Sequence, residues 1–281
     1  MRTLYISDLD GTLLNSEAKL SNKTTSMINQ LIENGLLFTI VTARSYKSAI
    51  DRITPLNLNI PIGFTYGAIA YDPISKQNLI KNLIPENIAN SILDLFTQSK
   101  LSPTLVHTLD NSEQYRTYYT EVPDNQGAKH YFQDRFDSND DRFRQINDYS
   151  NYPRNYTLEI AIIDKKEKLD PLYKKIQSLP VSCAFYSDFY TPDYNWIAIT
   201  HDFGNKNWIS NWLKRYTNAD KIVAFGDSLN DLPLFEAADA KCVVENGVSE
   251  LKQHATQVIG SNNEDGVANY LAGCMNEKVT K

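Results

Sequence analysis

The chain has 281 residues, an ordinary globular composition and a mild negative charge, formally -6 at pH 7. This length is enough for one large domain or two moderate ones. The lack of a basic excess argues against a nucleic-acid-binding protein. No stretch approaches the roughly 18 apolar residues of a membrane-spanning helix, and no long apolar segment precedes a cleavage site near the N-terminus. We therefore expect a cytoplasmic protein that binds neither nucleic acid nor membrane.

The first 82 residues alternate between predicted strands and helices. The apolar stretch LYIS is typical of a strand, and residues 22–34 carry apolar side chains at helical spacing before Gly35. The continuous apolar stretch LLFTIV predicts a strand covered on both faces, as in a parallel sheet. A second helix is predicted over 45–54, and residues 62–71 predict a further strand or a hairpin.

The C-terminal part repeats this alternation, with a Trp-rich helix, the buried strand KIVAFGD, and shorter helices and strands to the end. Alternation at both ends predicts an α/β fold with a doubly wound, mainly parallel sheet, built from residues 1–82 and 200–281. Residues 83–199 differ, with longer polar connections, strands patterned as half-exposed, and a charged, turn-prone stretch over 135–151 that we expect to be a solvated loop or helix end. They predict a separate α+β domain inserted into the sheet domain.

Polar residues follow several predicted strands of the sheet domain or begin a predicted helix there. They are Asp8 and Asp10 after LYIS, Thr42 after LLFTIV, Asp227 and Asp231 after KIVAFG, and Lys206 before the Trp-rich helix. Ligands of an open parallel sheet bind beyond the carboxyl ends of its strands. Chain order alone can therefore gather four acids, a hydroxyl and an ammonium group in one crevice.

This combination of side chains suits phosphoryl transfer. Mg²⁺ prefers oxygen ligands, which Asp8 or Asp10 together with Asp227 could supply. One of the first two carboxylates could attack phosphorus and form an aspartyl-phosphate. The other, if protonated, could donate to the leaving oxygen and later activate water.

The phosphate group needs donors on its remaining sides, because its oxygens repel an approaching carboxylate. The ammonium of Lys206 and the hydroxyl of Thr42 are candidates for this role. Backbone N–H groups around Leu9 and Ala43, just beyond two predicted strands, could also bind phosphate.

Four ordered motifs carry a family resemblance. DLDGTLL (8–14), VTAR (41–44), GNK (204–206) and GDSLNDLPLF (226–235) resemble those of haloacid dehalogenase superfamily phosphatases. The C-terminal stretch that begins VVENGVSELKQHA is similar to the Cof-type branch, class IIB, which carries a C2 cap. The resemblance covers both sheet segments and the position of the insertion.

The resemblance implies a role for each acid of the first and last motifs. Asp8 would be the nucleophile and Asp10 the general acid and base. Asp227 would bind Mg²⁺, and Asp231 would bind it directly or through water. Asp10 also favours hydrolysis, because relatives that keep a stable aspartyl-phosphate have Thr at that position.

The resemblance places the phosphate on Thr42, Lys206 and Asn230, and on the backbone at Leu9 and Ala43. Three departures from the family pattern stand nearby. The second motif commonly has Gly where this chain has Ala43, many relatives have Asn where Tyr66 stands, and the residues flanking Lys206 differ from the common Ser and Gly.

We therefore expect a Mg²⁺-dependent phosphomonoester hydrolase acting on a small phosphorylated metabolite. Sugar phosphates, nucleotides, flavin mononucleotide and pyridoxal phosphate are all open as substrates. A phosphomutase with the same acids, or a non-catalytic phosphate-ligand sensor, are the alternatives. About 160 residues separate Thr42 from Lys206, ample for a cap domain that excludes water and sets specificity. Nothing in the sequence indicates an oligomeric state.

Overall fold

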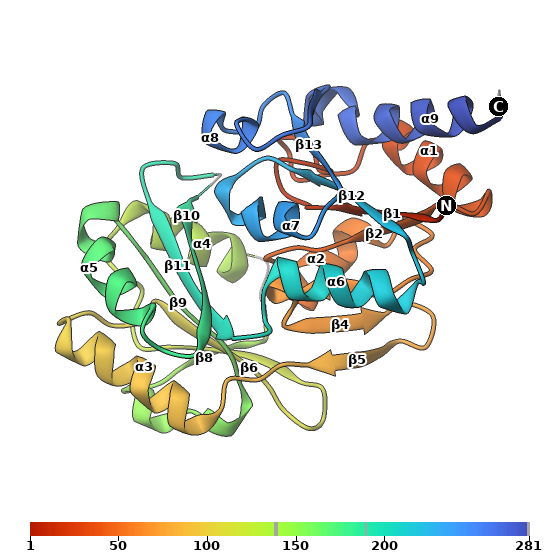
Figure 1. Cartoon of the computed structure of the whole chain (residues 1–281). Coiled ribbons are helices and arrows are strands. Elements are labelled where there is room, and N and C mark those ends of the chain that lie inside the picture. The colour runs from red at the N-terminus through yellow and green to blue at the C-terminus, as the bar shows by residue number, and fades with distance from the viewer. Residues whose placement is uncertain (138–139, 189, 280–281) are drawn as a thin grey trace. The chain divides into compact units, whose positions relative to one another are not determined.

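The computed structural model describes residues 1–137, 140–188 and 190–279 (Figure 1). The chain forms two compact units. We call Met1–Lys81 with Asn205–Lys281 the core unit, and Asn82–Gly204 the inserted unit. No helix in the described ranges is long and apolar enough to cross a membrane.

The core unit is built on a five-stranded parallel sheet in the order β14-β13-β12-β1-β2. Strand β1, which lies between β12 and the edge strand β2, is apolar throughout its middle, and Leu4 and Ile6 are fully buried. This burial on both faces explains why these strands read as continuous apolar stretches. The strands are β1 (Thr3–Ser7), β2 (Leu37–Ile40), β12 (Lys221–Gly226), β13 (Ala240–Val244) and β14 (Gln257–Ile259).

Helices flank this sheet, and α1 packs beside α9 although they lie at opposite ends of the chain (Figure 1). Helix α1 begins after Ser21, whose hydroxyl accepts a hydrogen bond from the N–H of Thr24 at 2.9 Å. Gly35, with φ +86°, ends this helical segment in the left-handed conformation that favours glycine. The helices are α1 (Asn22–Glu33), α2 (Tyr46–Ile53), α6 (Lys206–Tyr216), α7 (Leu232–Glu236), α8 (Ser249–Lys252) and α9 (Gly266–Val279).

A small antiparallel sheet completes the core unit, with strands β3 (Ile62–Phe64), β4 (Ile69–Asp72) and β5 (Gln77–Lys81). A parallel bridge between Val41 and Gly63 joins it to the end of β2. The predicted strand or hairpin over 62–71 is thus two short strands joined by a tight 3₁₀ turn.

The inserted unit contains a six-stranded sheet in the order β10-β11-β9-β6-β7-β8. All pairings are antiparallel except β7 with β8. Helices α3 and α5 contribute to the same apolar cluster as the sheet, for example through Ile92 and Leu172 against Ile160. Ala128 of α4 belongs to a second cluster with Ala161 and Trp196. The elements are α3 (Glu86–Gln98), β6 (Leu105–Leu109), β7 (Tyr115–Tyr119), α4 (Gln126–Asp137), β8 (Phe143–Gln145), β9 (Thr157–Asp164), α5 (Lys166–Ile176), β10 (Val181–Ser187) and β11 (Asn195–His201).

The predicted fold class, α/β with a doubly wound parallel core, is confirmed. Two details of the inserted unit differ from expectation. Strand β9 is buried up to Asp164 rather than half-exposed, because apolar clusters form on both of its faces. Within the charged stretch expected to be solvated, Arg142 is buried and paired with Asp140, at 2.7 Å from Nε to Oδ1. The chain passes between the units at 81/82 and 204/205, whereas the boundaries predicted from the sequence are 82/83 and 199/200.

Candidate active site

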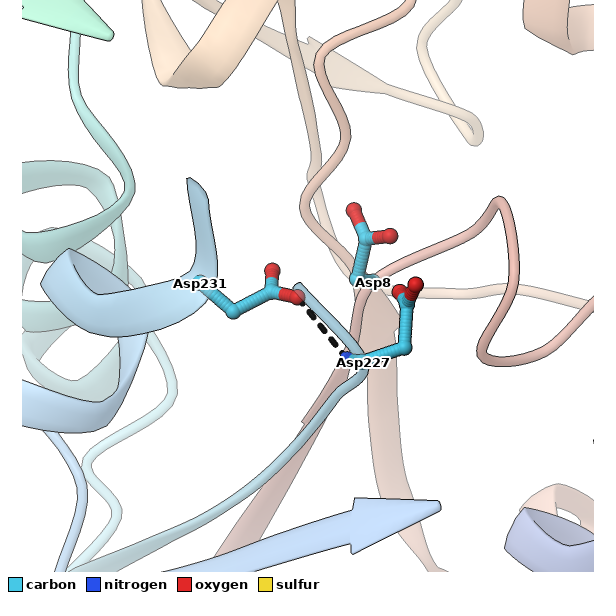
Figure 2. A group of neighbouring side chains, drawn as sticks. All are labelled: Asp8, Asp227 and Asp231. Carbon is cyan, nitrogen blue, oxygen red and sulfur yellow. Dashed lines mark hydrogen bonds between the residues drawn. The ribbon is translucent and has the colours of Figure 1, made fainter. Parts of the chain in front are cut away.

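Two neighbouring strands of the core sheet carry aspartates at their carboxyl ends. Because β1 and β12 are parallel and paired, the residues that follow them lie side by side. The N–H of Asp8 continues the ladder, donating to the carbonyl of Phe225 at 2.9 Å. Asp8, Asp227 and Asp231 each offer a carboxylate oxygen, and these oxygens lie within 4.8 Å of one another (Figure 2). All three residues are buried.

Asp231 is held by the backbone that follows β12. Its Oδ2 accepts hydrogen bonds from the N–H groups of Asp227 at 3.0 Å and Ser228 at 3.2 Å, the first drawn as the dashed line in Figure 2. Gly226 makes this approach possible, because a Cβ there would lie 2.7 Å from the Asp231 carboxylate. The carboxylate therefore has a fixed position.

Lys206, the first residue of α6, brings a buried positive charge to these acids. Its side chain is 0% exposed, and its Nζ lies 2.6 Å from Oδ1 of Asp8 and 2.6 Å from Oδ1 of Asp231. Asn205 caps the helix by accepting a hydrogen bond from its first turn. Burial alone would lower the pKa of Lys206, but the Asp231 and Asp8 carboxylates outweigh it and raise that pKa. The ammonium is charged at neutral pH.

One ammonium does not balance three carboxylates. Burial raises the pKa of Asp8 to about 7, against the lowering effect of Lys206 and with a further rise from Asp231. Burial, followed by Asp231 and Asp8, raises the pKa of Asp227 well above its ordinary value. Keeping these groups ionised requires a further cation in the cluster.

The donor atoms of the cluster fit Mg²⁺. Oδ1 of Asp8 accepts a hydrogen bond from Nζ of Lys206 at 2.6 Å. Oδ1 of Asp227 accepts one from the hydroxyl of Thr12 at 2.8 Å. No hydrogen bond or ion pair from the described residues occupies Oδ2 of Asp8 or Oδ2 of Asp227. Two carboxylate oxygens on adjacent strand ends are the kind of incomplete oxygen set that Mg²⁺ binds together with water and phosphate.

Asp10 lies outside this group of three acids. Its carboxylate instead receives two hydrogen bonds from Arg44, 2.6 Å from Nε to Oδ2 and 2.7 Å from Nη2 to Oδ1. The residue is partly exposed and is followed by Gly11 with φ +70°. Asp10 still affects the cluster electrostatically, because it contributes to the raised pKa of Asp8.

The candidate phosphate donors lie around the same strand ends. Thr42 is buried two residues beyond β2, where its N–H donates to the carbonyl of Gly63 at 2.9 Å. Ala43 follows it and is half-buried, and Leu9 is buried beside Asp8. The structure thus places these backbone groups next to the end of β1 or of its neighbour β2.

Asn230 joins the cluster through its side chain. Its Oδ1 lies 3.4 Å from Nζ of Lys206 and 3.1 Å from the hydroxyl of Ser228. Asn230 therefore lies near the ammonium of Lys206, together with Asp8, Asp227 and Asp231.

Sequence reasoning missed three contacts of this site. Arg44 lies within the quoted motif VTAR, and Thr12 lies within DLDGTLL, yet neither was assigned a partner. Asn246, far along the chain, donates from Nδ2 to the carbonyl of Gly11 at 2.7 Å. The sequence contained a signal for Arg44 and Thr12 only, because both are polar residues inside the four ordered motifs, whereas Asn246 lies outside them.

Residues 5–271 match the family of haloacid dehalogenase-like hydrolases. The chain belongs to this family. It is 25% identical over 291 residues to the 5-amino-6-(5-phospho-D-ribitylamino)uracil phosphatase YitU of Bacillus subtilis, covering 94% of each chain. It is 24% identical over 282 residues to the phosphatase YwtE of the same organism, covering 94% of this chain and 95% of YwtE.

Solved structures show the same fold. A haloacid dehalogenase-like hydrolase from B. subtilis has a TM-score of 0.76 at 22% identity, covering 95% of this chain and 98% of that one. Another, from Bacteroides thetaiotaomicron, has a TM-score of 0.75 at 19% identity, covering 98% and 100%. The predicted family and enzyme class, a haloacid dehalogenase-type phosphatase, are confirmed.

Proposed function

We propose that the protein hydrolyses the phosphomonoester of a small metabolite, with Mg²⁺ and through an aspartyl-phosphate on Asp8. One observation carries this proposal. A buried ammonium bridges Asp8 and Asp231 at 2.6 Å each, next to Asp227, and leaves one oxygen of Asp8 and one of Asp227 for a cation. A purely structural ion pair would not need a third buried carboxylate, since each unpaired buried charge costs stability.

Binding of the phosphate group is assigned to residues at the strand ends. Mg²⁺, held by Asp8 and Asp227, would supply positive charge to the phosphoryl oxygens. Lys206 and Asn230 approach from the side of α6 and β12, and Thr42 from the end of β2. Together they would neutralise the phosphate and orient it for in-line attack.

The chemistry then proceeds in two halves. A carboxylate oxygen of Asp8 attacks phosphorus, the ester P–O bond breaks, and Asp10 gives its proton to the leaving oxygen. Asp10 next removes a proton from water, which attacks phosphorus and breaks the P–O bond to Asp8. Inorganic phosphate leaves, and both aspartates return to their initial state.

The inserted unit is proposed to act as the cap. Its place in the chain, between Thr42 and Lys206, supports this role, as do relatives that match over almost their whole length. The names of YitU and YwtE support a small phosphorylated metabolite as substrate, since both are phosphatases of a phosphorylated ribitylaminouracil. The cytoplasmic location stays a prediction from the sequence.

Turnover of 4-nitrophenyl phosphate and of a panel of phosphorylated metabolites tests the proposal. We expect phosphate release that requires Mg²⁺ and stops on chelation, and we expect Asp8→Asn to abolish it while the circular dichroism spectrum is unchanged. Substantial activity in Asp8→Asn would contradict the assigned nucleophile. An isomeric sugar phosphate in place of free phosphate would indicate a phosphomutase, and binding without turnover would indicate a sensor.

A further inference from the structure

Arg44 contacts Asp10 through both arms of its guanidinium group. Nε donates to Oδ2 at 2.6 Å and Nη2 donates to Oδ1 at 2.7 Å. The pair is partly buried, with 13% of the Arg44 side chain and 23% of the Asp10 side chain exposed. Two parallel, charge-assisted hydrogen bonds fix the orientation of a carboxylate as well as its distance.

Arg44 is itself anchored on several sides. Its N–H donates to the hydroxyl of Thr42 at 3.1 Å, and its carbonyl accepts from the N–H of Thr65 at 2.8 Å. Its Nη1 donates to the carbonyl of Ser48 at 3.4 Å. Thr65 and Tyr66 have φ +50° and +58°, a left-handed conformation that is strained for a β-branched residue. A strained turn therefore holds the loop that presents the guanidinium.

The position of Asp10 explains why such an anchor matters. Asp10 lies on the loop after β1, its side chain is partly exposed, and Gly11 beside it has φ +70°. An aspartate in this setting has two side-chain torsions to restrict. Proton transfer requires it within hydrogen-bond reach of the leaving oxygen, and a displacement of about 1 Å can cost about 10²-fold in rate.

We propose that Arg44 is a positioning residue for leaving-group protonation: its planar guanidinium holds Asp10 in place as a carboxylate, and Asp10 takes up a proton from solvent before it donates that proton to the leaving oxygen. The inference rests on the proposed function, in which Asp10 handles this proton. It assigns Arg44 no contact with phosphate. Lysine cannot replace it, since an ammonium is a point charge without the planar fork that makes both bonds.

Leaving-group dependence separates this role from a structural one. Phenyl phosphate and 4-nitrophenyl phosphate have similar size, but only the phenolate of the first leaves poorly without a proton. The kcat/KM value reports events up to transfer of phosphate to Asp8, which includes this protonation. For Arg44→Lys we expect kcat/KM to fall about 10²-fold for phenyl phosphate, the scale of general acid catalysis. For 4-nitrophenyl phosphate we expect a fall of less than about threefold, since little proton donation is needed.

A matched control lies on the next helix. Arg52 donates from Nη1 to the same Ser48 carbonyl, at 2.7 Å. Arg52→Lys should change kcat/KM for the two esters by the same small factor. In an Asp10→Asn background, Arg44→Lys should cause no further change in the ratio of the two kcat/KM values, because its partner is already disabled.

The outcomes distinguish the inference from the function on which it rests. Suppose that the wild type is active but Arg44→Lys loses the same activity on both esters, or loses none on either. This result would overturn the inference and leave the proposed function standing. If Arg44→Lys still changed the ratio of the two kcat/KM values in the Asp10→Asn background, the inference would be overturned as well. A wild type that hydrolyses neither ester with Mg²⁺ would overturn both.

Discussion

Each unit buries a group of ionisable side chains, and the two groups avoid the cost of burial in opposite ways. In the core unit, the Lys206 ammonium pairs with the carboxyl groups of Asp8 and Asp231, and its Nζ lies 2.6 Å from Oδ1 of each. In the inserted unit, Glu159 of β9 faces His107 of β6 at 4.0 Å, too far for a hydrogen bond. A buried charge without a close partner is costly, so this second pair is expected to be neutral.

The pKa shifts of the second group agree with this expectation. Burial raises the pKa of Glu159 to about 8, and burial, helped by Arg142 and Arg135, lowers the pKa of His107 to about 3. At neutral pH the acid therefore keeps its proton and the imidazole is uncharged. Two hydroxyl groups contact the imidazole directly: that of Thr117 lies 2.8 Å from Nδ1 and that of Tyr131 lies 3.4 Å from Nε2.

This difference separates a reactive arrangement from a packed one. A site that transfers phosphate needs charges in place before the substrate arrives, and it must balance them with other charges. A sheet that only has to pack can lose its charges by gaining or releasing protons. The paired charges of the core unit are therefore the stronger indication of chemistry, although both groups are buried.

The largest expected effect comes from removing the Lys206 ammonium from the core cluster. Lys206→Met should lower kcat/KM about 10³-fold, since a donor to the transferring phosphate is lost. It should also lower the free energy of unfolding by about 3 kcal/mol, because buried carboxylates lose their partner. Urea unfolding without Mg²⁺ and turnover with Mg²⁺ measure the two effects.

A second lysine of the same helix provides the control. Nζ of Lys214 lies 3.6 Å from Oδ2 of Asp239 in a partly exposed ion pair. Lys214→Met should change the unfolding free energy by less than about 0.5 kcal/mol. If the two substitutions lowered the unfolding free energy equally, the buried Lys206 pair would not differ in strength from the partly exposed Lys214 pair.

The second expected effect is a pH-dependent stabilisation by Glu159→Gln. The pKa of Glu159 rises from 4.5 to about 8 on folding, so the folded protein keeps a proton that the unfolded chain releases. Wild-type stability should therefore fall as pH rises from about 4.5 to about 8 and then level off. Glutamine cannot ionise, so the variant should be more stable by about 2–4 kcal/mol at pH 9 and nearly equal at pH 4.5.

Other charged groups near Glu159 limit the pH range in which this is measured. His107 acts in the opposite direction, since the unfolded chain binds its proton below about 6.5 and the folded protein only below about 3, which lowers stability in acid. Arg142, Arg135 and Asp140 also face this group. Urea unfolding at pH 6 and pH 9, with the exposed Glu167→Gln variant as control, isolates the Glu159 contribution. If the unfolding free energies of Glu159→Gln and wild type differed by the same amount at pH 6 and pH 9, Glu159 would not be protonated in the folded protein and ionised in the unfolded chain.

The core cluster was predictable because each member stands at a strand end or a helix start. Parallel pairing then brings Asp8 and Asp227 together without any knowledge of side-chain conformation. The roles of these residues stay predictions, but their proximity follows from chain order. The same reasoning could not assign Arg44 to Asp10, because that pairing depends on loop conformations and on the strained turn beside Thr65.

The inserted unit was less predictable for a topological reason. His107 and Glu159 lie opposite each other only because β6 pairs with β9, and a helix and two further strands separate them in the chain. Antiparallel register between distant strands leaves no local signal in the sequence. The burial of β9 was missed for the same reason, since a strand's pattern does not reveal what covers its second face.

The smallest expected effect compares one hydroxyl in each group. Thr12→Val removes the hydrogen bond to Oδ1 of Asp227, and Thr117→Val removes the partner of Nδ1 of His107, both bonds being 2.8 Å long. A bond to a charged group contributes about 1.5–3 kcal/mol and a bond between neutral groups about 1 kcal/mol. Thr12→Val should therefore cost about twice as much stability once Asp227 is ionised, which urea unfolding at increasing pH measures, since burial raises the pKa of Asp227 well above its ordinary value. Its cost should also decrease when Mg²⁺ is added, because the cation would hold Asp227 in place of the hydroxyl, whereas the cost of Thr117→Val should not depend on Mg²⁺. Equal costs with equal Mg²⁺ dependence would mean that the two groups do not differ in charge.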